Sequence, residues 1–127
     1  MIEKILLFFS SIFSHLLSYW QNRESLKLGG VPRSPLWRMF RQKQIILRGG
    51  KCELCGGTEL LELHHIEPFH KNPVRELDPT NVMILCESGK NGIVCHRGFG
   101  HLGNYQSINI NVEADVREWR LKIQNRP

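Results

Sequence analysis

The chain begins with an apolar run whose spacing is typical of a helix. Between residues 5 and 20, apolar side chains recur every three or four positions, while serines and His15 gather on the other side. This pattern predicts an amphipathic helix. The run is shorter than the about 18–20 residues of a membrane span, and it lacks the cleavage site of a signal peptide. We expect the helix to pack on its own domain or on a partner, with contact to a membrane surface as the less favoured alternative.

A second helix is expected between Ser34 and the glycine pair Gly49-Gly50. Ser34 is a suitable N-cap, Pro35 suits the first helical position, and the two glycines favour a stop at the C-terminal end. The predicted inward face of this helix consists of Leu36, Phe40 and Leu47.

After residue 51 the pattern changes to that of strands. Residues 60–66 predict one strand, which Pro68 ends, and residues 82–85 predict a second strand that runs into Cys86. The polar segment between the two strands should be a loop. The order of these elements predicts a hairpin with a long connection.

Two further helices are expected after the hairpin. A short one should begin near Cys95, and a longer one should cover residues 112–124, with Asn111 as its cap. Together the elements predict an α+β domain over residues 29–127. Residues 1–28 would precede it as a separate helix and linker.

The charge of the chain is unevenly distributed. The formal net charge is +5, yet residues 21–51 alone carry eight Lys and Arg against one Glu, whereas residues 52–87 carry seven carboxylates against two basic residues. A basic block beside an acidic one suggests an anionic partner, and nucleic acid is the usual one. Three arginines of the second helix are spaced to share a face that would contact phosphate: Arg38, Arg41 and Arg48.

The four cysteines are arranged as two pairs around the hairpin. Cys52 and Cys55 form a C-x-x-C motif followed by two glycines, while Cys86 ends the second strand and Cys95 precedes the short helix. We expect the reducing cytoplasm, where zinc is favoured over two disulfides or free thiols. Four thiolates leave no open position for water, so the zinc would be structural.

Histidines supply the remaining chemistry. His64 and His65 are adjacent, so a straight strand would direct them to opposite faces, and they can serve one site only where the strand ends. One of them can then bind a metal while the other faces substrate. His96 follows Cys95 directly, so the zinc site would place it against the hairpin.

In order, these motifs resemble those of the HNH endonucleases, which have the ββα-metal fold. The resemblance rests on Cys52-Cys55, on LELHHIEPFH, on LDPTNVMILC and on VCHRGFGHLGN, and it runs from about Ser34 to Pro127. It is strongest to small free-standing HNH endonucleases of phages and prophages. It implies a zinc-bound ββα core with flanking helices.

The resemblance also implies roles for single residues. His64 and His96 would bind the catalytic metal, His65 would be the general base, and Asn81 would tie the loop and orient that base. The four cysteines match the structural zinc site of many members. His65 would take a proton from the attacking water, and the products would carry 5′-phosphate and 3′-hydroxyl ends.

Two departures from the family pattern affect the site. The last two cysteines, usually two residues apart, are here separated by residues 87–94, which changes the local geometry. His64 stands where other members have Asp or His. Imidazole is a better ligand for softer ions than for Mg²⁺, so His64 could change the metal preference. The catalytic ion is expected to be Mg²⁺, Mn²⁺, Ni²⁺ or Zn²⁺. His101 lies at an awkward helical offset from His96 and is assigned to phosphate contact, and His70 has no assigned role.

Two alternatives explain part of the pattern. A zinc-ribbon module that binds DNA without catalysis accounts for the cysteines and the charge but not for the histidines and Asn81 together. A nuclease accessory to phage DNA packaging would have the same chemistry, with a terminase as partner and the host cytoplasm as its location. DNA is the expected partner in each case, and no small-molecule cofactor is expected.

Overall fold

The protein is seen here in a computed structural model that describes Phe13 and residues 31–126. The helix expected over residues 5–20 therefore lies outside the described residues. Within the part that is described, no helix is both long and apolar enough to cross a membrane.

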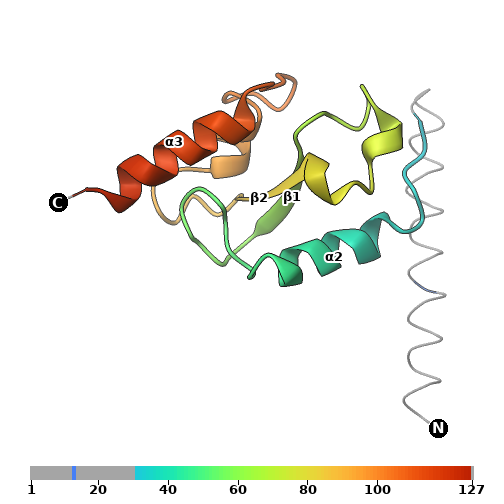
Figure 1. The fold of residues 1–127 in the computed structure, drawn as a ribbon, viewed down its shortest axis with the longest axis horizontal. Coiled ribbons are helices and arrows are strands. Elements are labelled where there is room, and N and C mark those ends of the chain that lie inside the picture. The colour runs from blue at the N-terminus through green and yellow to red at the C-terminus, as the bar shows by residue number, and fades with distance from the viewer. Residues whose placement is uncertain (1–12, 14–30, 127) are drawn as a thin grey trace, which may run out of the picture.

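A two-stranded antiparallel sheet forms the centre of the domain. Strand β1 (Leu61–His65) pairs with β2 (Val82–Cys86) so that Leu61 lies opposite Cys86 and His65 opposite Val82. Helix α2 (Trp37–Leu47) and helix α3 (Val112–Gln124) lie on opposite sides of the strands (Figure 1). The hairpin is followed by η3 (His96–Gly100), a single π-helical turn that contacts both strands. The predicted α+β class with flanking helices is confirmed.

Every residue of β2 is buried, because the strand is covered on both faces. On one face, Val82 and Ile84 pack with Leu63 against α2, and on the other Met83 and Leu85 pack against the cysteines and α3. Two short 3₁₀ turns, η1 (Pro73–Arg75) and η2 (Pro79–Asn81), occupy the connection between the strands.

Helix α2 faces the sheet with a different set of residues from the one expected. Trp37, Phe40 and Ile45 pack on the hairpin, whereas Leu36 and Leu47 are exposed, so their predicted inward position is wrong. The Ser34 hydroxyl accepts a hydrogen bond from the Leu36 amide in a turn ahead of the helix, so Leu36 lies outside the helix, which begins at Trp37. The packing of Trp37 and Ile45 on the hairpin turns the exposed face, with Leu47, towards solvent.

The ends of the two long helices differ in their agreement with the prediction. The glycine stop of α2 is confirmed, since Gly49 has a φ of +90° and its amide bonds to the Ile46 carbonyl. Helix α3 covers the predicted residues, but the Asn111 side chain makes no capping hydrogen bond. Asn109 acts there instead, because its side chain accepts from the Asn111 amide and donates to the Asp115 carboxylate.

Candidate active site

Four cysteines from three segments meet beneath α3. Their sulfur atoms all lie within 4.8 Å of one another, although they come from the turn before β1, the end of β2 and the start of η3. The Sγ atoms of Cys55 and Cys86 are 3.6 Å apart. Sulfurs bound at about 2.3 Å in a tetrahedron would be about 3.8 Å apart, so the arrangement fits a zinc ion. The members of this cysteine cluster are Cys52, Cys55, Cys86 and Cys95.

The ionisation of the cysteine cluster also suits a cation. The side-chain interaction with Cys95 lowers the pKa of Cys52 to about 4, while the same interaction, together with burial, raises the pKa of Cys95. The thiolate of Cys52 is thus favoured even without a counter-charge, whereas burial and then the charge of Cys52 raise the pKa of Cys55. A bound metal ion counters these increases in pKa, because thiolates are its ligands. The four cysteines can therefore hold zinc.

Three histidines from β1 and the two ends of η3 form a second cluster. Nitrogen atoms of His64, His96 and His101 lie within 4.8 Å of one another, and the ring centroids are between 4.8 and 5.1 Å apart. His64 comes from β1, His96 begins η3 and His101 follows its last residue. The structure thus brings together the two predicted metal ligands, His64 and His96. It adds His101, which the sequence assigned to phosphate contact.

The π-helical turn explains why His101 joins the cluster. A π-helix bonds residue i to residue i+5, so an offset of five residues places two side chains on successive turns. In an α-helix the same offset would separate them around the axis. The offset between His96 and His101 is therefore unfavourable only if η3 is assumed to be α-helical.

The two later histidines are held by hydrogen bonds at Nδ1. His96 Nδ1 bonds to the Glu87 carboxylate, which also accepts from the Tyr105 hydroxyl, and His101 Nδ1 lies 3.0 Å from the Ser107 carbonyl oxygen. Because these partners are acceptors, each of the two rings carries its proton on Nδ1. The Nε2 atoms of His96 and His101, each with a lone pair, then lie 3.2 Å apart. Two lone pairs so close together are favourable when a cation lies between them.

His64 completes the cluster as a buried and neutral ring. Burial, and after it the neighbouring His96 and His101, lower the pKa of His64 to about 3. Neutral imidazole is the form that binds metal ions. The donor set of three imidazoles therefore fits a divalent transition metal.

Gly100 allows η3 to approach β1 this closely. A Cβ atom at this position would lie 3.0 Å from two atoms of the His64 ring and 3.2 Å from Cδ2 of His96. Only a residue without a side chain leaves both rings in place. Gly100 thus sets the distance between two of the candidate ligands.

His65 lies in different surroundings from His64. Its ring stacks on Trp37 of α2 with centroids 4.7 Å apart, and its Nε2 lies 2.9 Å from the Glu76 carbonyl oxygen. The carbonyl can only accept, so the proton belongs on Nε2 and the lone pair on Nδ1. Burial lowers the pKa of His65, opposed by the bond to Glu76 and assisted by Arg33. At neutral pH this ring is uncharged.

Asn81 holds the connection between the strands in shape. It is 1% exposed, and its side chain accepts from the Glu67 amide at 2.8 Å and donates to the carbonyls of Glu67 and Arg75 at 3.1 and 3.2 Å. These bonds fix the loop from both sides. Arg75 directly precedes Glu76, so Asn81 also fixes the carbonyl that orients His65.

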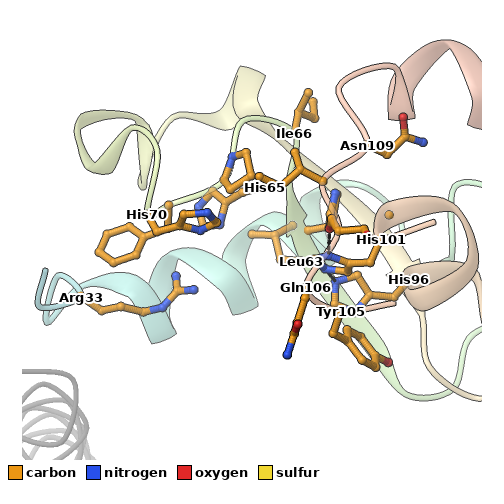
Figure 2. Close-up of a pocket in the computed structure, with 16 residues that line it drawn as sticks. Arg33, Leu63, His65, Ile66, His70, His96, His101, Tyr105, Gln106 and Asn109 are labelled. Carbon is orange, nitrogen blue, oxygen red and sulfur yellow. Dashed lines mark hydrogen bonds between the residues drawn. The ribbon is translucent and has the colours of Figure 1, made fainter. Parts of the chain in front are cut away.

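Both kinds of histidine line one pocket of about 260 Å³. Figure 2 shows His96, His101 and Tyr105 at one end, with Arg33 and His70 at the other and His65 between them. His70 is exposed at the rim. The strand ends at His65, which allows two adjacent residues with different neighbours to line the same pocket.

The three arginines expected to contact phosphate have different partners. Arg41 donates to the Leu61 carbonyl and pairs with Glu62 at 3.1 Å, while Arg48 pairs with Glu53 at 3.6 Å. Arg38 is exposed. The spacing along α2 is as expected, but two of the three guanidinium groups turn towards the hairpin rather than forming one free basic row.

Two residues of the site were not found from the sequence. Glu87 has a weak signal, since it follows Cys86 directly in the segment that departs from the family spacing. Arg33 has none, because it is one of eight basic residues in the segment 21–51 and nothing in its spacing distinguishes it from the others. Tertiary contacts are needed to place Arg33 at the pocket and Glu87 against His96.

The hairpin, the π-helical turn and the two clusters define a small α+β domain whose cysteines and histidines could each hold a metal ion. Residues 52–98 match the family model described as HNH endonuclease, and this segment is therefore an HNH domain. No curated protein and no solved structure matched the chain. The matched segment contains all four cysteines and ends before His101. An HNH domain indicates a nuclease or DNA-binding function that involves DNA and a metal.

Proposed function

We propose that this chain is a metal-dependent endonuclease that hydrolyses phosphodiester bonds of DNA, with His65 as its general base. The observation that carries the proposal is that two adjacent histidines line one pocket in different surroundings. His64 lies among other imidazoles, whereas His65 contacts Trp37 and Glu76. One can bind an ion while its neighbour transfers a proton.

His65 would take a proton from the water molecule that attacks phosphorus. Its Nε2–H is engaged by the Glu76 carbonyl, so Nδ1 is the nitrogen that can accept this proton. A lowered pKa supports this role at pH 7, because the ring need not lose a proton before it accepts one. Asn81 would act as a positioning residue through its bond to the Arg75 carbonyl.

His64, His96 and His101 would hold the catalytic ion. When bound, a divalent ion would supply positive charge beside the phosphate as negative charge develops there. The protein's part is to present three imidazole rings in fixed orientations, which Glu87 and Ser107 support. Three imidazoles favour Ni²⁺ or Zn²⁺ over Mg²⁺. The four cysteines would hold a separate structural zinc, since they leave no open position.

DNA is the proposed substrate because the family and the charge agree. The net charge is +5, and Arg38 remains a predicted phosphate contact on α2. Origin in a phage and a terminase partner remain predictions from resemblance. Contact of residues 1–28 with a membrane surface also remains a less favoured prediction.

The test is plasmid cleavage with each of Mg²⁺, Mn²⁺, Ni²⁺ and Zn²⁺, in the wild type and in single histidine variants. His65→Ala should lose about 100- to 10,000-fold in single-turnover rate while still binding DNA and the ion. His64→Ala and His96→Ala should lose ion affinity and regain activity at high metal concentration. His70→Ala, at the pocket rim, is the matched control and should cleave normally.

Three outcomes would change this assignment. Near-normal cleavage by His65→Ala would remove it as the base. Selective loss of ion binding in His65→Ala would mean that the roles of the two adjacent histidines are exchanged. DNA binding by the wild type without cleavage under any of the four metals would favour the non-catalytic DNA-binding module.

A further inference from the structure

Arg33 lies at the end of the pocket away from the histidine cluster. Its guanidinium stands over the ring of Trp37 at 4.6 Å and over that of Phe69 at 4.7 Å, measured to the ring centroids. Two aromatic faces hold the guanidinium plane and leave its N–H edge available. An arginine that served only to form an ion pair would not need two aromatic rings to orient its guanidinium.

Arg33 has a carboxylate beside it to neutralise its charge, but its NH1 group has no hydrogen-bond partner among the described residues. NH1 lies 3.6 Å from Oε1 of Glu76, close enough for an ion pair and too far for a hydrogen bond. Both atoms are buried and have no hydrogen-bond partner among the described residues. The arginine side chain is nevertheless 40% exposed, whereas that of Glu76 is 6% exposed. The remaining N–H groups can therefore meet a ligand that enters the pocket.

Arg33 and the proposed base are held by the same two residues. Trp37 contacts both the Arg33 guanidinium and the His65 ring. Glu76 pairs with Arg33 through its side chain and accepts from His65 through its backbone carbonyl, and its other carboxylate oxygen accepts from the Ser34 amide at 3.0 Å. The two side chains thus keep a fixed relation to each other, as a binding group and a reacting group must.

We propose that Arg33 binds a phosphate oxygen of the DNA backbone in this pocket and holds the phosphodiester beside His65. This inference rests on the proposed function. Guanidinium matches phosphate through two parallel charge-assisted hydrogen bonds, and the aromatic stacking prepares it for this geometry. Among the residues that line the described pocket, Arg33 is the one Lys or Arg, and none is Asp or Glu.

The arginines of α2 do not meet the same conditions. Arg41 and Arg48 donate to backbone carbonyls and pair with carboxylates on the hairpin side of the helix. Neither lines the pocket that contains His65. The phosphate nearest the base therefore has Arg33, from the segment ahead of the helix, as its cationic partner.

The test measures DNA affinity as a function of salt and, separately, single-turnover cleavage. Affinity is measured in the His65→Ala background, in which DNA stays intact. Arg33→Gln should lower the slope of log affinity against log salt by about one, for all DNA sequences alike. In the wild-type background it should lower the cleavage rate at subsaturating DNA by about 10- to 100-fold, as expected for a lost charge-assisted contact.

Two variants separate phosphate binding from a structural role. Arg33→Lys keeps the charge, so it should keep the salt slope but lose cleavage because the paired donors are gone. Arg33→Gln combined with Glu76→Gln removes the uncompensated buried carboxylate and should restore thermal stability but neither affinity nor rate. Lys122→Gln, near the C-terminal end of α3, removes the same charge away from the pocket and should change neither.

Recovery of affinity and rate in the Arg33→Gln/Glu76→Gln variant would overturn the proposal, because Arg33 would then serve only to neutralise Glu76. A slope of log affinity against log salt equal to that of the protein with Arg33 intact would also overturn the proposal. Failure of the proposed function looks different. The wild type would then cleave no DNA under any metal, while the affinity measurements, which need no cleavage, would still decide the role of Arg33.

Discussion

The Glu87 carboxylate accepts a hydrogen bond from Nδ1 of His96 and so fixes the ring of a candidate metal ligand. Glu87 begins the segment of residues 87–94 that separates the last two cysteines, which is longer than the two residues expected from the family pattern. Partial burial raises the pKa of Glu87, but the hydrogen bonds from Tyr105 and His96 outweigh this effect and lower it. The insertion therefore supplies a charged acceptor to the histidine cluster.

Glu87→Gln should weaken binding of the catalytic ion by about 10- to 100-fold, because partners that orient a ligand contribute this much to metal affinity. The measurement is calorimetric titration of Ni²⁺ or Zn²⁺ into protein whose cysteine cluster is already filled. Glu59→Gln is the control, since Glu59 is exposed and pairs with Lys90 on the surface. Equal ion affinity in Glu87→Gln and the wild type would show that the contact does not support the ligand.

Gly100→Ala should reduce ion binding at the histidine cluster without loss of the zinc fold. The new methyl group would lie 3.0 Å from the His64 ring, so the rings must separate by a few tenths of an ångström. Gly98→Ala is a close control in the same turn, because its nearest neighbour would be Ile93 at 3.7 Å, an ordinary contact. Ion affinity and zinc content are measured for both variants. Similar ion affinities in the two would mean that the cluster tolerates the shift.

Removal of one cysteine should unfold the hairpin. Cys95 is fully buried and lies between β2 and η3, so Cys95→Ser should release zinc and lower the free energy of unfolding by several kcal/mol. Elemental analysis should find one tightly bound zinc per chain in the wild type, even when the histidine cluster is disrupted by His64→Ala. A folded wild-type protein without zinc would contradict the structural role.

Removal of residues 1–28 should leave the domain folded and its cleavage largely intact. The described sheet, both clusters and the pocket are built from residues after position 30. Thermal unfolding and plasmid cleavage of residues 29–127 are compared with those of the full chain. If the shortened protein is unfolded, the N-terminal segment belongs to the core and the predicted boundary is wrong.

Most of the elements could be predicted because each is specified by nearby residues. The two strands and α3 follow from local periodicity, and Gly49 ends α2 through its own backbone conformation. The buried face of α2 could not be predicted, because apolar residues lie on more than one side of the helix. The contacts of Trp37, Phe40 and Ile45 with the hairpin decide which side is buried.

The site, like the fold, has one part that the sequence predicts and another that depends on tertiary contacts. The residue types and their order were enough to indicate a cysteine site, a histidine site and an HNH domain, since ligand chemistry depends on side-chain identity and spacing. The place of His101 depends on the π-helical turn, and the places of Glu87 and Arg33 depend on contacts between segments distant in the chain. Such contacts form only when the hairpin, α2 and η3 pack together. The sequence alone therefore determined which groups carry the chemistry, and the tertiary structure decided which of them meet, because packing sets the distances between them.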